Sequence, residues 1–305
     1  MLSQTKKDRI EVLLKRAYQS HDWDEMRRLA LEILELDANQ LEALVLLSDA
    51  SEDEREQIGL LRRALALLPS SQADVSRLTR DKRELKATIL ERLATALLEI
   101  DPNEALVHAS QAIETDPVYC ETSRSLLYSA LLLLRRFGDV LIELFQDITG
   151  CPARFYARAL ALYCLGGKGE AFFQGLWEAL AKDPDMAFYA LGFWPDPPQE
   201  DDDEWDYLRV ASIMIVPWLD HEEAYGWLMT ATLLFGYLTD RLPDATLEEL
   251  KPYLIQVDFM DEMNRSLGEF EAMLRPLGEL SPEEIDAAAC RYLRQNELSR
   301  PLWRN

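Results

Sequence analysis

The chain has 305 residues and a formal net charge of −23 at pH 7, with 48% hydrophobic residues and only 12 glycines and 14 prolines. This charge argues against nucleic acids and anionic membrane surfaces as partners, because their phosphate groups would be repelled. No apolar run reaches the roughly 18 residues that a membrane-spanning helix needs, and Asp8 and Glu11 precede any apolar stretch a signal peptide would require. The four cysteines form no CxxC pair, so we expect free thiols and a cytoplasmic protein.

Residues 7–40 predict a pair of antiparallel helices. Ile10, Leu13, Leu14 and Ala17 recur at helical spacing, which gives the first helix one apolar face. A Ser-His turn follows, and Asp22 is suited to cap the second helix. One such hairpin cannot bury its own apolar face, so we expect it to stack against a neighbour.

The same pattern predicts further hairpins at 41–69, 86–117, 121–152 and 153–184. Their helices are expected at Leu41–Ala50, Glu56–Leu68, Lys86–Ile100, Asn103–Thr115, Glu121–Arg136, Asp139–Ile148, Ala153–Leu165 and Gly169–Lys182. The hairpins end at Ala38, Pro69, Pro117, Pro152 and Pro184, which are 31, 48, 35 and 32 residues apart. The longest interval contains the polar segment Ser70–Arg83, which is either a longer loop or an extension of the next helix.

Residues 101–117 show the pattern most completely. Asp101 is suited to cap the helix, Pro102 sits where its missing N–H costs nothing, and Glu104 is placed to complete a capping box. Small residues recur on one face, where another helix can approach closely: Ala105, Ala109 and Ala112. Asp116-Pro117 is expected to end the helix.

A period of about 34 residues with paired helices resembles the tetratricopeptide repeat. Asp22-Trp23-Asp24-Glu25 stands where this family typically has Gly-Asp-Tyr-x-Glu, and the hairpin at 153–184 has Gly167-x-Gly169-Glu170-Ala171 at its turn. Further matching residues are Ala105, Ala112, Pro117, Ala179 and Asp183-Pro184. The resemblance covers roughly residues 7–184. It implies an all-α fold, a right-handed superhelical solenoid of paired antiparallel helices, and a scaffold that binds protein segments.

The character of the chain changes after the fifth hairpin. A Pro-rich stretch at 192–198 and an acidic run at Glu200–Asp206 follow a short helical segment, Met186–Leu191. We therefore predict about five repeats over residues 7–191, a linker at 192–206 and a C-terminal helical module at 207–298. Helices at Trp205–Leu219 and Glu222–Leu238 are expected to be buried.

Two capping boxes predict the remaining helices. Thr246 should start one that runs toward Leu274, and Ser281 should start one that runs toward Gln295. The segment Asp183–Leu228 also resembles proteins similar to suppressor of tumorigenicity 7, in which a Pro-rich loop, an acidic stretch and Ala-x-x-Trp-Leu follow the repeats. That resemblance implies a helical repeat scaffold without a defined chemistry.

The first helix of each hairpin is expected to line a concave face that binds a protein or peptide, and a basic or an amphipathic segment would suit it. The predicted lining residues are Glu11, Lys15, Tyr18, Leu90, Ala94, Leu97, Ser125, Ser129 and Leu132. Trp194 and Trp205 flank the acidic run and are candidate aromatic anchors for a basic partner. The apolar middle of this face is expected to hold either a partner segment or the chain's own C-terminal part.

No motif indicates catalysis, a cofactor or a metal. His21, His108 and His221 lie far apart in sequence, and Gly166-Gly167-Lys168-Gly169 follows a helix rather than a strand, so it favours a turn over a phosphate loop. The acidic run at Glu200–Asp206 lacks the spacing of a calcium loop. We therefore expect a non-catalytic protein-interaction scaffold. The alternative is a regulatory protein that senses a small ligand in its aromatic C-terminal module.

Overall fold

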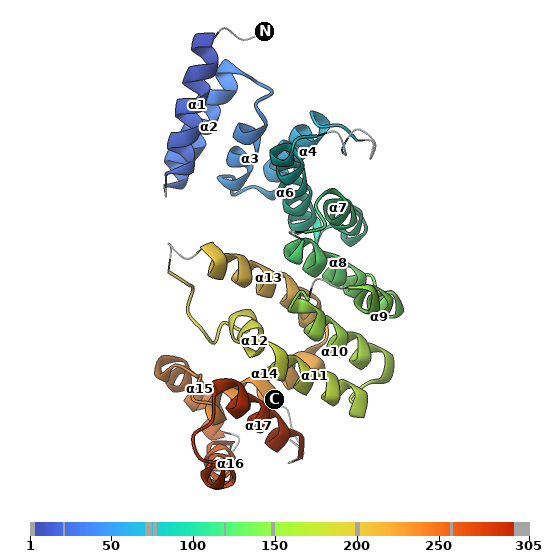
Figure 1. The fold of residues 1–305 in the computed structure, drawn as a ribbon, viewed down its shortest axis with the longest axis vertical. Coiled ribbons are helices and arrows are strands. Elements are labelled where there is room, and N and C mark those ends of the chain that lie inside the picture. Colours follow the sequence, from blue (N-terminus) through green and yellow to red (C-terminus); the bar gives the residue numbers. More distant parts are fainter. Residues whose placement is uncertain are drawn as a thin grey trace. The chain divides into compact units, whose positions relative to one another are not determined.

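The computed structural model describes residues 4–20, 22–70, 75, 78–118, 120–147, 150–198, 202–256 and 259–295, with side chains left out at 202, 203, 253–256, 259 and 262. All regular secondary structure in these ranges is helical (Figure 1). His21, most of Ser70–Val75 and the start of the predicted acidic run lie outside the described residues. The chain divides into two units between Leu127 and Tyr128. The predicted domain boundaries at residues 191 and 206 stay predictions.

The first unit is a succession of helix pairs. Its helices are α1 (Gln4–Tyr18), α2 (Trp23–Leu36), α3 (Leu41–Asp49), α4 (Glu54–Ala66), α6 (Arg80–Leu97), α7 (Pro102–Thr115) and the first half of α8 (Glu121–Leu133). Each helix from α1 to α7 packs on the next one along the chain. The expected hairpins are therefore present. The helix expected from Lys86 starts earlier, at Arg80, so the end of the polar segment extends it.

Interior positions of this unit follow the predicted apolar faces. Ile10, Leu13 and Ala17 of α1 pack with Leu29, Ala30 and Ile33 of α2 in one buried cluster. The small residues Ala105, Ala109 and Ala112 of α7 are also buried, as the close approach of a neighbouring helix requires. Successive second helices are linked by ion pairs, Arg27 of α2 to Glu56 of α4 and Arg62 of α4 to Glu104 of α7.

The caps explain where these helices begin. The Asp22 carboxylate accepts hydrogen bonds from the backbone N–H groups of Asp24 and Glu25, and Asp101 accepts from Asn103 and Glu104, as predicted. The second hydrogen bond of the predicted capping box, from the Asp101 N–H to the Glu104 carboxylate, is not formed, so this prediction is wrong. The Glu104 carboxylate binds Arg62 at 2.6 Å, and the Asp101 N–H donates to the Leu97 carbonyl instead. The guanidinium is the stronger donor for a carboxylate.

The second unit combines the last hairpins with the C-terminal helices. It contains the rest of α8, then α9 (Phe137–Gln146), α10 (Ala153–Gly166), α11 (Glu170–Lys182), α12 (Pro184–Ala190), α13 (Asp202–Leu219), α14 (Glu222–Leu238), α15 (Asp244–Gln256), α16 (Phe259–Leu274), a 3-10 turn (Arg275–Leu277) and α17 (Pro282–Gln295). α13 packs on α10, while α14 and α17 pack on α11. The C-terminal module therefore covers one side of the fifth hairpin.

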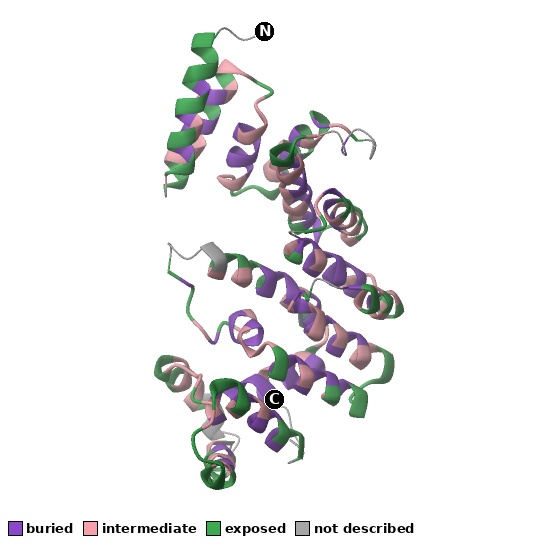
Figure 2. Cartoon of the chain, viewed as in Figure 1, coloured by how far each residue is buried: buried purple, intermediate pink, exposed green. Residues whose placement is uncertain are grey.

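The helices of this unit differ in how far they are buried. Figure 2 shows α16 largely exposed, whereas α14 is buried almost all round, as its sequence predicts. α13 is buried only from Val210 onward, so the prediction for its first half is wrong. The helix expected from Thr246 to Leu274 is two helices, α15 and α16, and the Thr246 hydroxyl donates to the Phe193 carbonyl rather than capping. The Ser281–Glu284 capping box is confirmed.

Candidate protein-binding groove

The predicted concave-face residues fall into two groups. Glu11, Lys15 and Tyr18 of α1 are exposed, so they remain available to a partner. The Tyr18 ring is 62% exposed, but partial desolvation raises the pKa of its hydroxyl, the Glu42 carboxylate adds to that rise, and Arg92 opposes it. Tyr18 therefore lies near charged groups of α3 and α6.

The remaining predicted lining residues lie in the interior. Leu90, Ala94 and Leu97 are buried because α6 packs against both α4 and α7. Ser125, Ser129 and Leu132 of α8 are buried too, and the Ser129 hydroxyl donates to the Ile213 carbonyl of α13 at 3.0 Å. This corrects the prediction that these six residues bind a partner. At Ser129 the structure agrees with the other expectation for this face, because a C-terminal helix covers it. The spacing of these residues is that of a contact face, and other helices occupy it.

The two candidate tryptophans serve contacts within the chain. Trp194 stacks on Phe188 with ring centroids 5.0 Å apart and donates its indole N–H to the Arg241 carbonyl at 2.9 Å. Trp205 is partly exposed and donates to the Pro198 carbonyl at 3.0 Å. Of the two, only Trp205 presents much of its ring to solvent.

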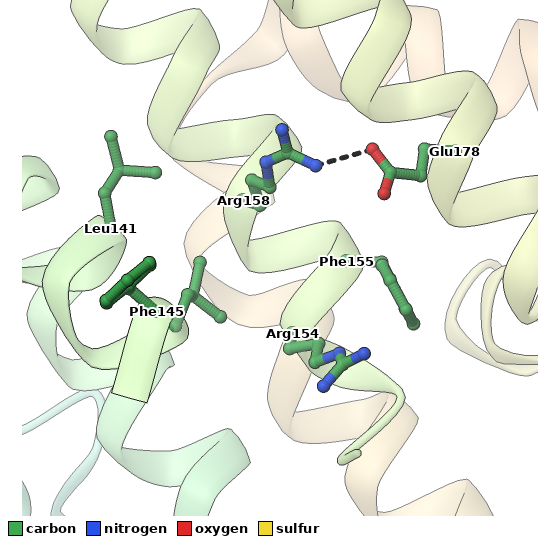
Figure 3. Close-up of a pocket in the computed structure, with 7 residues that line it drawn as sticks. Leu141, Phe145, Arg154, Phe155, Arg158 and Glu178 are labelled. Atoms are coloured by element: carbon green, nitrogen blue, oxygen red, sulfur yellow. Dashed lines mark hydrogen bonds and ion pairs between the residues drawn. The ribbon is translucent and has the colours of Figure 1, made fainter. Parts of the chain in front are cut away.

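The structure shows a different opening, between α9, α10 and α11. We call it the α9–α11 groove and define it by its lining residues: Leu141, Leu144, Phe145, Arg154, Phe155, Arg158 and Glu178. Its volume is about 410 Å³. In Figure 3, Leu141 and Phe145 come from one side, and Arg154, Phe155 and Arg158 come from the neighbouring helix. The groove thus lies between two second helices, α9 and α11, with the first helix α10 between them.

Local interactions hold α9 with an apolar side turned outward. Arg136 binds Asp139 at 2.6 Å at its start, and at its end the buried Asp147 accepts a hydrogen bond from the Tyr128 hydroxyl at 2.7 Å. Between them only Val140 is buried. Ile142 is 56% exposed and Phe145 is 93% exposed, although both are large apolar side chains. Two such side chains on one short helix beside a cavity make this side of α9 a candidate contact surface.

Cations lie beside this apolar side. The Arg158 guanidinium donates to the Glu178 carboxylate at 2.5 Å, which joins α10 to α11 across the groove (Figure 3). Arg154 lies over the Phe155 ring, with its guanidinium carbon 4.6 Å from the centroid, in a cation–π contact. The groove therefore offers one apolar wall and two guanidinium groups in an otherwise strongly acidic chain.

Sequence reasoning missed this groove, although its signal was present. Leu141, Leu144 and Phe145 stand at i, i+3 and i+4, which favours a buried face. The pattern alone does not show whether another helix covers that face. α9 has only 10 residues, and its packing on α10 leaves the outward side uncovered.

One pair outside the groove superficially resembles a nucleophile with its base. The Cys164 sulfur lies 3.4 Å from Nε2 of His221, at the junction of α10 and α14. Burial raises the pKa of the Cys164 thiol to about 11, with Arg135 opposing the rise, and burial also lowers the pKa of His221. Both groups are therefore neutral near pH 7, whereas covalent catalysis needs a thiolate. We interpret the pair as a packing contact.

The other cavity described, of about 290 Å³, is polar and is crossed by an internal ion-pair cluster. Arg241 binds Asp185 and Asp286, each at 2.6 Å, and Tyr207 donates to Asp183 at the edge. The described residues hold no group of three or more His, Cys, Asp or Glu side chains arranged for a metal ion. Within the same residues, no helix has both the length and the apolar character to cross a membrane.

Comparisons with protein-family models, with curated proteins and with solved structures found no match.

Proposed function

We propose that this chain is a non-catalytic protein-interaction scaffold of the tetratricopeptide-repeat type, and that the α9–α11 groove is a binding site for a partner segment. The observation that carries the proposal is the outward apolar side of α9, above all Phe145 at 93% exposure beside the cavity. Large exposed aromatic side chains next to a concavity are typical anchors of protein interfaces.

The helical hairpins support this function. In the first unit each hairpin packs on the next, and pairs such as Arg27–Glu56 and Arg62–Glu104 link consecutive second helices. Stacked hairpins of this kind form extended surfaces for binding, and we propose that they wind into a right-handed superhelix. The net charge of −23 favours protein partners over nucleic acids, and a cytoplasmic location is part of the same proposal.

The ligand-sensing alternative has less support. It requires an aromatic pocket in the C-terminal module, but the rings there pack against one another: Phe188 with Trp194 and Phe235, and Phe173 with Trp227. The cavity near these helices is lined by carboxylates, Arg241 and Tyr207. We therefore favour the interaction scaffold.

Affinity capture with matched surface variants tests the proposal. The full chain, its Phe145→Ser variant and a Val107→Ser control are each used as bait in a native lysate of the source organism. Val107 is also a largely exposed apolar residue, on α7. The proposal predicts a specific partner that is retained by the control and at least tenfold depleted by Phe145→Ser. Equal recovery with all three baits, or no partner with the unaltered chain, would contradict the groove as the binding site.

A further inference from the structure

The α9–α11 groove has two chemically different sides. Leu141, Leu144 and Phe145 of α9 form an apolar wall, with Phe145 almost fully in solvent. Arg154 and Arg158 project from α10, one turn apart, on the other side (Figure 3). A ligand that fills the groove therefore meets apolar surface and positive charge at once.

The two arginines are not equivalent. Arg158 is already neutralised by Glu178 at 2.5 Å. Within the described part of the chain, no carboxylate pairs with Arg154, whose one specific contact is the Phe155 ring. Stacking on an aromatic ring fixes the guanidinium plane while leaving its N–H donors directed elsewhere. Arg154 is thus preorganised to bind a carboxylate.

We infer that the α9–α11 groove binds a short amphipathic segment of a partner protein, with a large apolar side chain against Phe145 and an Asp or Glu carboxylate on Arg154. This inference rests on the proposed function and adds the chemistry of the partner. It also revises the expected charge of the partner. The chain as a whole is acidic, but this groove presents one guanidinium, that of Arg154, with no carboxylate partner among the described residues, so an acidic side chain fits beside it better than a basic one.

Two synthetic peptides test the inference. Both are 14-residue, capped, alanine-based helices with Leu and Phe four residues apart. One carries Glu one turn further on, and the other carries Lys at that position. Binding to the full chain is measured by fluorescence anisotropy. The position of binding is read from the methyl resonances of Leu141 and Leu144 in a methyl-labelled sample.

The inference predicts that the Glu peptide binds at least tenfold more tightly than the Lys peptide and shifts the Leu141 and Leu144 methyl signals. Arg154→Gln should bring the two affinities within about twofold, because it removes only the charge preference. Phe145→Ser should weaken both peptides at least tenfold, while Val107→Ser should change neither. Since Phe145 and Val107 are exposed, these variants are not expected to disturb folding.

The failure modes are distinguishable. If both peptides bind with equal affinity and depend on Phe145, the acidic partner is wrong but the groove remains a binding site. If neither binds, the inference is overturned. A smaller sedimentation coefficient for Phe145→Ser than for the unaltered chain would then show that a second copy of the chain fills the groove. Peptide-induced shifts confined to other methyl groups also overturn the inference.

Discussion

Single side chains in this molecule are often used differently from what their sequence position suggests. Trp23 stands at the first turn where the repeat pattern has a tyrosine, yet it is 60% exposed. The start of α2 is fixed instead by the Asp22 carboxylate, which accepts from two backbone N–H groups. Asp22, and not its neighbour Trp23, therefore fixes the start of this helix.

Trp23→Ala should lower the free energy of unfolding by no more than about 0.5 kcal/mol, as expected for an exposed side chain. Asp22→Ala should lower it by about 1 kcal/mol, because it removes the helix cap. Urea unfolding followed by circular dichroism measures both. A loss of about 3–5 kcal/mol for Trp23→Ala would show that the ring is buried after all.

The Cys164–His221 contact leads to a second prediction for a single side chain. With its pKa raised to about 11, the Cys164 thiol should react with iodoacetamide at pH 7.5 roughly two orders of magnitude more slowly than an unperturbed thiol. Its reaction rate should rise about tenfold for each pH unit, because the thiolate fraction does. Mass spectrometry of labelled peptides between pH 7 and 9 measures the rate. Labelling as fast as that of free cysteine at pH 7.5 would mean a thiolate, and would reopen the question of a nucleophile.

Between elements, the second unit depends on close contacts that the hydrophobic pattern does not specify. Gly236 in α14 leaves no room for a methyl group, since an added Cβ would lie 2.7 Å from the Phe188 ring and 2.8 Å from Leu242. Gly59 in α4 has nothing within 4 Å of the same position. The same substitution should therefore have opposite effects at the two sites.

Gly236→Ala should lower the free energy of unfolding by about 1–3 kcal/mol through overpacking. Gly59→Ala should raise it by up to about 1 kcal/mol, because alanine is the better helix former. Chemical unfolding of both variants tests the pair. A neutral or stabilising effect at Gly236 would contradict the packing of α14 against Phe188.

Arg241 connects α12 and α17 by binding Asp185 and Asp286. Burial raises the pKa of both carboxyls, and Arg241 opposes the rise. A carboxyl whose pKa is higher in the folded than in the unfolded state binds protons more tightly when folded. These two groups therefore stabilise the fold as the pH falls through their folded-state pKa, and this contribution is lost as the pH rises.

Arg241→Met should consequently destabilise the chain by about 2 kcal/mol at pH 7.5, a value reduced because Asp185 is half exposed. At pH 5 the loss should be smaller, since the unpaired carboxyls can take up protons. The control is Arg62→Met, which breaks the exposed pair with Glu104 and should cost under about 1 kcal/mol at either pH. Equal losses at both pH values for Arg241→Met would contradict this coupling.

For the whole molecule, the sequence predicted the helices well, but it predicted poorly which helices pack against one another. Periodicity, caps at Asp22 and Asp101, and terminal prolines gave the hairpins, because these signals are local. Periodicity could not say which apolar faces are covered. Leu90 and Ser129 were predicted to contact a partner and are buried, whereas Phe145, to which the sequence assigned no role, is exposed. That distinction depends on contacts between segments far apart in sequence, such as Ser129 with Ile213.

The central claim is that a partner contacts the α9–α11 groove. Replacing Phe145 in the full chain with the photo-reactive residue benzoylphenylalanine, and irradiating in a native lysate, tests it most directly. The same replacement at Val107 is the control. We predict a discrete cross-linked partner from position 145 and none from position 107. No adduct at 145, or the same adducts from both positions, would contradict the claim.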